Sequence, residues 1–230
     1  MSAMPAMRAI AHIRSEFPEK FGIPRQSRLV QTLRAQIVPE PPFRSRDAFR
    51  GLDGYSHIWL IWLFSRAVRS EWIPTVRPPR LGGNTRVGVF ATRSPFRPNP
   101  IGLSCVQLDR IDFDAPDGPV LHVLGADLMD GTPILDIKPY LPHTDAVPDA
   151  CAGFAGAFAD YGLTVVCPPA LAARFPAARW AALRGVLAQD PRPSYQTDPA
   201  RVYGLRFAGF NIRFTVDGSV LTVCGIAPED

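Results

Sequence analysis

The stretch SHIWLIWLF, residues 56–64, is the most apolar part of the chain and decides the fold class. Its apolar run, Ile58 to Phe64, is far shorter than the ~20 residues that a membrane-spanning helix needs. The stretch therefore predicts a central β-strand in a protein without a transmembrane segment.

Further short strand candidates lie on both sides of this stretch, separated by turns that contain proline or glycine. They cover residues 7–13, 29–38, 86–92, 102–113, 120–127 and 133–137. Short strands at close spacing, without amphipathic helices between them, favour a barrel or a sandwich. The 25 prolines are about twice the average share, which disfavours a bundle of long helices. We therefore expect a mainly β fold.

The composition of the chain changes after about Pro148, where an alanine- and glycine-rich connector begins. Residues 168–188 then carry apolar side chains at helical spacing. Strands are expected at residues 202–207, 210–216 and 220–226, with Asp217-Gly218 as a hairpin turn. These features predict two domains, residues 1–148 and 149–230, of which the second is a small α+β domain.

Charge and cysteine content limit the function classes only broadly. A formal charge of +4 and a pI near 9.1 are compatible with RNA binding but do not require it. Only Lys20 and Lys138 are lysines, and an arginine-biased genome explains that pattern as well as phosphate binding does.

The four cysteines form no C-x-x-C pair, so we expect buried free thiols and no zinc cluster or disulfide framework. Charged residues interrupt the apolar N-terminus, which excludes a signal-peptide core and, with the free thiols, predicts a cytoplasmic protein.

Residues 75–100 carry the strongest local signal. The segment is rich in proline and glycine and holds five arginines without an acidic residue, namely Arg77, Arg80, Arg86, Arg93 and Arg97. Such a segment cannot form a regular helix, so its arginines project from loops and can converge on an anion. From charge alone, a solvated basic loop with some salt bridges is an equally good reading.

A second polar cluster, residues 125–140, places Asp127, Asp130 and Asp136 around the turn Gly131-Thr132-Pro133. A tight turn of this kind exposes backbone amides and carbonyls that can grip a polar cofactor, and Asp130 can cap it. Three nearby carboxylates could instead hold a cation such as magnesium, although no histidine or second glycine-rich loop supports a metal site.

A third candidate is the proline-fixed turn Pro24-Arg25-Gln26, which presents a guanidinium and an amide but in isolation reads equally as an ordinary loop. The four histidines lie near or within predicted strands, where a packed or exposed role is expected ahead of a ligand or base. The chain has no G-x-G-x-x-G, P-loop or G-x-S-x-G pattern, so the usual nucleotide folds and serine hydrolases are disfavoured.

Taken together, these segments closely resemble the TrmO (TsaA-like, YaeB) family. The resemblance rests on PRQ at 24–26, PTVRPPRLGGN at 74–84, VFATRSPFRPNPIG at 89–102, DGTP at 130–133 and DIKPY at 136–140. The runs AQDPRP at 188–193 and FNIR at 210–213 extend it into the C-terminal part. It therefore covers nearly the whole chain.

The resemblance implies a tRNA methyltransferase that moves a methyl group from S-adenosylmethionine to N6 of the threonylcarbamoylated adenosine just 3′ of the anticodon. It also implies a methyltransferase β-barrel in place of a Rossmann sheet, so the missing glycine fingerprint is expected. Such an enzyme works as a homodimer with the cofactor near the subunit boundary. The implied partners are the anticodon loop of tRNA and a second copy of the chain.

Carried over residue by residue, the implied cofactor contacts fall on Pro24, Arg25, Gln26, Ser65, Arg66, Arg93, Leu103, Asp130, Gly131, Thr132 and Pro133. One pair departs from the pattern, because related members have His-Gln where this chain has Ser65-Arg66. A backbone contact at this pair survives the change, whereas an imidazole role does not.

The implied chemistry agrees with the residues present. S-adenosylmethionine carries an activated methyl group, so the protein mainly has to align the reacting atoms and exclude water, without a metal or a covalent nucleophile. Arg77, Arg80 and Arg97 are expected to bind tRNA phosphates, while aromatic side chains capture the unpaired base. Asp136 or Tyr140 is expected to accept the proton from N6.

Two other classes of function stay open at this point. A non-catalytic RNA-binding module would bind tRNA in a salt-dependent way without affinity for the cofactor. A metal-dependent hydrolase built on Asp127, Asp130 and Asp136 would lose its activity with a chelator. The long, specific runs favour the methyltransferase over both.

Overall fold

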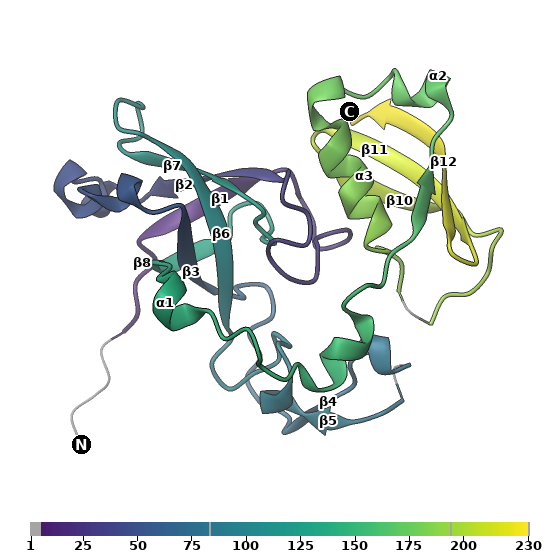
Figure 1. Ribbon diagram of the computed structural model, residues 1–230, viewed down its shortest axis with the longest axis horizontal. Coiled ribbons are helices and arrows are strands. Elements are labelled where there is room, and N and C mark those ends of the chain that lie inside the picture. Colours follow the sequence, from purple (N-terminus) through teal and green to yellow (C-terminus); the bar gives the residue numbers. More distant parts are fainter. Residues whose placement is uncertain (1–5, 83, 194, 230) are drawn as a thin grey trace.

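Two bodies of mainly β structure make up the computed structural model, which describes residues 6–82, 84–193 and 195–229 (Figure 1). The first is a closed barrel of β1 (Ala11–Ser15), β2 (Arg34–Pro39), β3 (His57–Leu63), β6 (Ile101–Asp112), β7 (Val120–Leu124) and β8 (Pro133–Pro139). The strands close in the order β1-β2-β7-β6-β3-β8, and every neighbouring pair is antiparallel. The expected mainly β fold is confirmed, and the barrel forms in place of the sandwich.

Strand β3 lies in the barrel wall between β6 and β8. Its residues Ile58, Leu60 and Trp62 are buried inside the barrel, because side chains alternate across a strand. The other strands contribute to the same core, among others with Ile13, Ile37, Val106, Leu121 and Ile134. Trp59 and Ile61 point outward, where an antiparallel sheet usually presents polar residues to water. The outer face of β3 is therefore unusually apolar.

The second body is a sheet with the order β10-β11-β12-β9, covered on one face by α3 (Figure 1). Its strands are β9 (Thr164–Val166), β10 (Tyr203–Phe207), β11 (Phe210–Asp217) and β12 (Val220–Pro228). Strand β9 pairs with β12 in parallel, and the other pairs are antiparallel. This arrangement confirms the expected small α+β unit, although β9 was missing from the sequence prediction.

The helical region of the second body, whose apolar side chains over residues 168–188 have helical spacing, is divided into short helices. It consists of α2 (Pro169–Ala172), η7 (Ala177–Arg179) and α3 (Trp180–Ala188). Pro176 precedes η7 and explains the break, because proline lacks the N–H of a helical hydrogen bond and disfavours helix at the preceding residue.

The hairpin between β11 and β12 turns at Gly218-Ser219, one residue later than expected. Asp217 still pairs with Val220, and Gly218 takes the positive φ of 55° that the turn needs.

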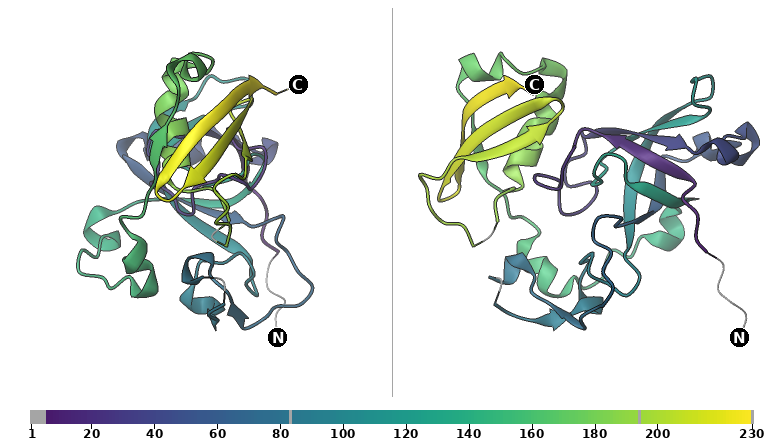
Figure 2. Two further views of the ribbon diagram at one scale, coloured as in Figure 1. Left: turned by 90° about the vertical axis from the view of Figure 1, so that its right-hand side faces the viewer. Right: turned by 180° about the vertical axis from the view of Figure 1, so that it is seen from behind.

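The connection between β1 and β2, residues 16–33 and here called the β1–β2 loop, joins the two bodies. Its apolar side chains pack into the core of the second body and not into the barrel: Phe17, Phe21, Ile23, Val30 and Leu33. Figures 1 and 2 show this loop reaching from the barrel to α3 and the C-terminal sheet. Residues 29–33 therefore belong to the loop, whereas the sequence placed them in a strand.

Close backbone approach and polar contacts fix the β1–β2 loop to the second body. A Cβ added at Gly22 would lie 2.1 Å from Leu205, so only glycine fits there. The Ala208 N–H donates to the Glu16 carbonyl at 3.0 Å, and Arg179 pairs with the Glu16 carboxylate at 3.1 Å. Burial raises the pKa of Glu16, although Arg179 opposes that shift. The loop is thus a shared element of both bodies.

The remaining short elements are β4 (Thr75–Val76), β5 (Val87–Gly88), α1 (Pro142–Asp145), η1 (Pro41–Phe43), η2 (Arg46–Phe49), η3 (Leu52–Gly54), η4 (Pro79–Leu81), η5 (Val89–Ala91) and η6 (Gly153–Phe158). Among the described residues of the arginine-rich segment, strand pairing is limited to β4 and β5, and the strand expected over 86–92 is mostly absent. Residues 7–10, expected to begin the first strand, form no regular structure.

Cysteine burial follows the expectation only in part. Cys105 is buried, Cys167 is partly exposed, and Cys151 and Cys224 are exposed. The prediction of buried thiols was therefore wrong for the last two residues. Within the described ranges, no helix is long and apolar enough to cross a membrane.

Candidate functional site

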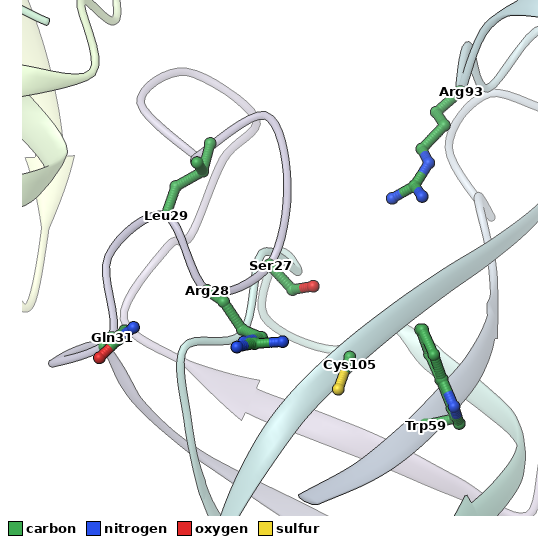
Figure 3. Close-up of a pocket in the computed structure, with 7 residues that line it drawn as sticks. All are labelled: Ser27, Arg28, Leu29, Gln31, Trp59, Arg93 and Cys105. Atoms are coloured by element: carbon green, nitrogen blue, oxygen red, sulfur yellow. The ribbon is translucent and has the colours of Figure 1, made fainter. Parts of the chain in front are cut away.

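A cavity of about 320 Å³ lies between the β1–β2 loop, the outer face of β3 and β6, and the loop that precedes β6. It is lined by Ser27, Arg28, Leu29, Gln31, Trp59, Arg93 and Cys105 (Figure 3). A second hollow of about 260 Å³ shares Arg28 and Gln31 and adds His57, Gln107, Leu124 and Gly125. The first volume falls at the lower end of the ~300–1,000 Å³ range of small-molecule sites.

Strand register explains which side chains form the floor of this site. Residues directly opposite each other on neighbouring strands project to the same face. On the outer face, three cross-strand rows run over β8, β3 and β6: Asp136, Ile61 and Leu103; Lys138, Trp59 and Cys105; and, beyond the end of β8, Tyr140, His57 and Gln107. The register therefore brings the candidates Asp136, Leu103 and Tyr140 to the same face as Trp59.

Gln26 and Arg93, both expected to contact a cofactor, meet directly although 67 residues separate them in the chain. One guanidinium nitrogen of Arg93 donates to the side-chain oxygen of Gln26, and the Gln26 amide donates to the Arg25 carbonyl. Pro24, which fixes this turn, is buried, whereas Arg25 is exposed. The contact, here called the Gln26–Arg93 bracket, stands at the edge of the cavity because Ser27 and Arg93 line it (Figure 3).

Arg28 adds a second guanidinium to the cavity, and sequence analysis did not single it out. Its backbone φ of 67° lies in the left-handed region that glycine favours, and its N–H donates to the Gly125 carbonyl at 2.9 Å. The side chain hydrogen-bonds to Cys105, whose pKa is raised mainly by burial. Burial and the charge of Arg28 also lower the pKa of His57, which favours a neutral imidazole at neutral pH.

Asp127 stands next to the bracket. Ser104 donates to its carboxylate at 2.6 Å, and the backbone N–H of Ser27 also hydrogen-bonds to it. Burial raises the pKa of Asp127 to about 6, although these bonds and the charge of Arg93 oppose the shift. Asp127 is therefore a carboxylate whose charge changes close to neutral pH.

The turn at residues 130–133 is bound to β1, which differs from the expected exposure of its amides. The N–H groups of Asp130 and Gly131 donate to the carbonyls of Phe17 and Ile13, at 2.9 and 2.8 Å. The Asp130 carboxylate accepts from the Ser15 N–H at 2.9 Å, so it caps β1 and not its own turn. Thr132 is buried and Pro133 is partly buried. None of residues 130–133 lines the cavity shown in Figure 3.

Asp136 and Tyr140, the candidate proton acceptors, lie along the same edge of the outer face but do not touch the cavity. Lys138 pairs with Asp136 at 2.9 Å. The Tyr140 ring packs beside Trp59, with 5.8 Å between ring centroids, and the Trp59 indole N–H donates to Asp145 on α1 at 2.8 Å. These contacts hold the Trp59 ring beside the cavity.

Ser65 and Arg66 follow β3 and are both exposed, with the Ser65 N–H donating to the Leu63 carbonyl. Neither residue lines the cavity. Because both residues are exposed, a contact between their backbone and the cofactor stays a prediction.

The candidate RNA contacts occupy different positions in the arginine-rich segment. Arg77 is exposed, whereas one nitrogen of Arg97 donates to the carbonyls of Val89 and Thr92 and so stabilises the loop itself. The side chain of Arg80 lies outside the described part of the structure. Two exposed aromatic residues, Trp72 and Phe90, lie in the same region. Their ring centroids are 6.1 Å apart, and the residues are 50% and 73% exposed.

A metal centre has no support in the geometry. Asp127, Asp130 and Asp136 bind separate partners, namely Ser104, Ser15 and Lys138. Over the described residues, no three histidine, cysteine, aspartate or glutamate side chains come together in a group that could hold a metal ion.

Comparison with protein families gives two matches along the chain. The model of the tRNA-methyltransferase O N-terminal domain matches residues 12–146, and that of the TrmO C-terminal domain matches residues 171–229. The chain belongs to the tRNA-methyltransferase O (TrmO) family. The matches leave residues 147–170 between them, so the expected domain division at residue 148 stays a prediction.

Two curated relatives and a solved structure of TrmO are similar to this chain over most of its length. A tRNA (adenine(37)-N6)-methyltransferase of Escherichia coli is 41% identical over 96% of this chain and 97% of its own length. A protein of the same name from Eikenella corrodens is 48% identical over 71% of this chain and 92% of its own. A crystal structure of TrmO from Pseudomonas aeruginosa has a TM-score of 0.76 and 36% identity, covering 98% of this chain and all of that chain.

Sequence reasoning missed Trp59, Cys105 and Arg28 as residues that line this cavity. A signal for Trp59 was present, since the residues of β3 that alternate with the barrel core are apolar, and an apolar outer face indicates a covered or ligand-binding surface. No sequence signal marked Arg28, because its position depends on a left-handed turn that is typical of glycine.

Proposed function

We propose that this protein is an S-adenosylmethionine-dependent tRNA methyltransferase that modifies N6 of an adenosine beside the anticodon. The observation that carries the proposal is the Gln26–Arg93 bracket beside the cavity lined by Trp59 and Arg28. The bracket joins two motif residues from distant parts of the chain, and the E. coli and Eikenella relatives are named as enzymes of the same reaction class.

The residues of the cavity suit a nucleoside that carries an amino-acid tail. A purine needs an aromatic or apolar surface, which Trp59 and Leu29 supply at the cavity wall. A carboxylate needs a guanidinium, and both Arg28 and Arg93 reach the cavity (Figure 3). We therefore propose that S-adenosylmethionine binds here, with Arg93 in the cavity and Pro24, Arg25, Gln26 and Leu103 next to it as its contacts. The turn at 130–133 and the pair Ser65-Arg66 lie outside the cavity, so contacts with them are proposed from the family resemblance alone.

When bound, the cofactor supplies an activated, positively charged methyl donor, so the protein does not have to generate one. The part left to the protein is alignment and exclusion of water. Trp59 is held by Asp145 and Tyr140, which pre-orients one wall of the site. Asp136 and Tyr140 remain proposed acceptors for the N6 proton, and an unchanged single-turnover rate after replacement of both would refute that role.

The tRNA is proposed to approach over the arginine-rich segment. From residue 72 to residue 108 the chain has no acidic side chain, so the surface around Arg77 and Arg86 attracts phosphates. The exposed rings of Trp72 and Phe90 lie in this basic surface, where unpaired bases can stack. Arg80 and Arg97 are also proposed to contact phosphates. One nitrogen of Arg97 is used in the loop, so this contact would be made by its other guanidinium nitrogens.

Two finer points belong to the same proposal. The substrate adenosine is proposed to carry the threonylcarbamoyl group, and the protein is proposed to act as a homodimer in the cytoplasm. Leu103 supports the homodimer, because its side chain is 50% exposed beside the apolar outer face of β3 and a partner subunit would cover it. Sedimentation at micromolar concentration tests the dimer directly.

Calorimetry with S-adenosylhomocysteine, the demethylated cofactor, tests the central claim without RNA. The wild type should bind, and Arg93→Ala should bind at least tenfold more weakly while unfolding at a similar temperature, since Arg93 is exposed. Binding of tRNA without any affinity for the cofactor would instead support the non-catalytic RNA-binding alternative. Mass spectrometry of tRNA nucleosides before and after incubation identifies the modified base and the need for threonylcarbamoylation.

A further inference from the structure

Asp127 is a partly buried carboxylate, just after β7, to which the proposed reaction assigns no role. Its Oδ1 atom accepts a hydrogen bond of 2.6 Å from Ser104, whose hydroxyl oxygen accepts one of 3.0 Å from the Trp62 indole. Because an indole nitrogen only donates, the single hydroxyl proton of Ser104 is committed to Asp127. The carboxylate thus ends a polar chain that starts inside the barrel.

On its other side, Asp127 faces the β1–β2 loop beside the Gln26–Arg93 bracket. Two residues before it, the Gly125 carbonyl accepts from the Arg28 N–H at 2.9 Å, which brings the backbone around Ser27 next to the carboxylate. The Ser27 N–H and the charge of Arg93 both favour the ionised form of Asp127. Ser27 and Arg93 both line the cavity, whereas Asp127 is not among the lining residues. Asp127 therefore connects the rigid barrel wall to the two segments that approach the cavity from opposite sides.

We propose that ionised Asp127 is a positioning residue, which holds the Ser27 backbone and the Arg93 side chain in the arrangement that binds the cofactor. The inference rests on the proposed function, because it concerns the same site. It assigns Asp127 a role distinct from metal binding and from contact with the cofactor.

The charge of Asp127 is essential to this role, because both groups that it holds are donors. A neutral carboxyl keeps an acceptor for Ser104 but attracts Arg93 and the Ser27 N–H much less. An asparagine at this position also lacks the charge and keeps an acceptor for Ser104, so it stands in for the neutral carboxyl.

The pH range of the effect follows from the surroundings of the carboxylate. Burial raises the pKa of Asp127 to about 6, and the opposing contributions come from Ser104, two backbone amides and Arg93. Arg93 is the charged group that acts on Asp127, whereas its partners on β6 and the β1–β2 loop are neutral. A change of cofactor affinity between pH 7.5 and pH 5 therefore reports on Asp127.

The test is the dissociation constant of S-adenosylhomocysteine, measured by calorimetry between pH 5 and pH 8. If the neutral form binds about tenfold more weakly than the ionised form, the wild-type constant should rise about fivefold between pH 7.5 and pH 5. Asp127→Asn should bind about tenfold more weakly at pH 7.5. The ratio of the two constants should fall towards one at pH 5, and titration of the ligand cancels in this ratio.

Two further variants separate positioning from a merely structural role. Ser104→Ala removes a hydrogen bond that lowers the pKa of Asp127, so it should move the midpoint of the pH dependence upward. Asp117→Asn is the matched control, since Asp117 pairs with Arg14 on the surface and should follow the wild type at every pH.

A ratio of wild-type to Asp127→Asn constants that stays the same from pH 5 to pH 8 would overturn the inference and leave the proposed function intact. A wild type that binds no S-adenosylhomocysteine at any pH would overturn the proposed function, and the inference with it. The wild-type titration needs no substitution, so the inference remains testable even if Asp127→Asn does not fold.

Discussion

Arg28 occupies a left-handed backbone conformation, at a φ of 67°, that costs an ordinary residue roughly 1–2 kcal/mol and costs glycine almost nothing. The contact of its side chain with Cys105, at the wall of the cavity, offsets part of this cost. The backbone strain and the side-chain contribution can therefore be separated by substitution.

We expect Arg28→Gly to be more stable than Arg28→Ala by about 1 kcal/mol, because both lack the guanidinium but only alanine keeps the strain. Urea unfolding of the two variants measures the difference. Equal stabilities, or a more stable alanine variant, would show that the left-handed conformation at residue 28 is wrong.

Asp127 gives a prediction about stability that runs opposite to its effect on cofactor affinity. Its pKa is raised from 3.8 to about 6, so the favourable contribution of the neutral form is complete below pH 3.8 and is lost as the pH rises through 6. Without cofactor, Asp127→Asn should therefore gain stability relative to the wild type, by on the order of 2–3 kcal/mol between pH 4 and pH 7. Chemical denaturation at both pH values measures this gain, and a constant difference would contradict it.

At the residue scale, the sequence could predict the motif residues but not how they are held. Gln26 and Arg93 were candidates from their motifs, and the structure places them in contact. Asp127 was a candidate only as one of three clustered aspartates, although its partners are Ser104 and Ser27. Sequence spacing cannot show such contacts, because barrel closure brings them together.

At the scale of elements, the β1–β2 loop is the segment on which both bodies depend. One side of it packs into the C-terminal core through Val30 and Leu33, and the other side carries Gln26 and lines the cavity with Ser27. A disturbance on the C-terminal side should therefore reach the cofactor site.

Gly185 on α3 provides a defined disturbance, because a Cβ there would lie 2.6 Å from a methyl group of Val30. We expect the clash in Gly185→Ala to cost about 1–3 kcal/mol of stability, of which the better helix propensity of alanine offsets a part. The variant should also bind S-adenosylhomocysteine more weakly. The double variant Gly185→Ala/Val30→Ala should recover part of the affinity, since the second change removes the clashing methyl groups.

Gly54→Ala is the control for this experiment, because Gly54 has open space around its Cα and should tolerate the methyl group. An unchanged cofactor affinity in Gly185→Ala would mean that the packing of α3 against the loop is not transmitted to the site. Thermal unfolding and calorimetry on the same samples separate the two effects.

The elements themselves were predictable where one local pattern dominated. The alternation in β3 and the apolar strands of the C-terminal sheet are confirmed. Residues 29–33 were misassigned to a strand, because their apolar side chains serve the core of the other body, and local pattern cannot say which core an apolar residue joins.

At the scale of the whole molecule, the basic surface around Arg77 and the exposed rings of Trp72 and Phe90 should contribute to tRNA binding in different ways. We expect Arg77→Ala to weaken binding and to reduce the slope of log affinity against log salt concentration by about 1. Phe90→Ala should cost about 1–3 kcal/mol without changing that slope, because stacking releases no counterions. Titrations of tRNA at several salt concentrations measure both quantities.

Arg50→Ala serves as the control, since Arg50 is also exposed but follows η2, in the connection between β2 and β3, next to its partner Asp47. If Arg50→Ala reduces the slope as much as Arg77→Ala does, the phosphate contacts are spread over the molecule and the proposed tRNA surface is wrong. A Phe90→Ala variant with wild-type affinity but altered sedimentation would assign the aromatic pair to contact between subunits.

The placement of the β1–β2 loop also limits how members of this family can be recombined. Consider a chimera of two family members that is joined in the linker between the two family matches. Its β1–β2 loop, residues 16–33, would come from one parent, whereas the C-terminal core that receives this loop would come from the other. Gly22 against Leu205 and Val30 against Gly185 would then have to match by chance. The C-terminal body and the β1–β2 loop therefore form one structural unit, and a functional hybrid has to exchange both together.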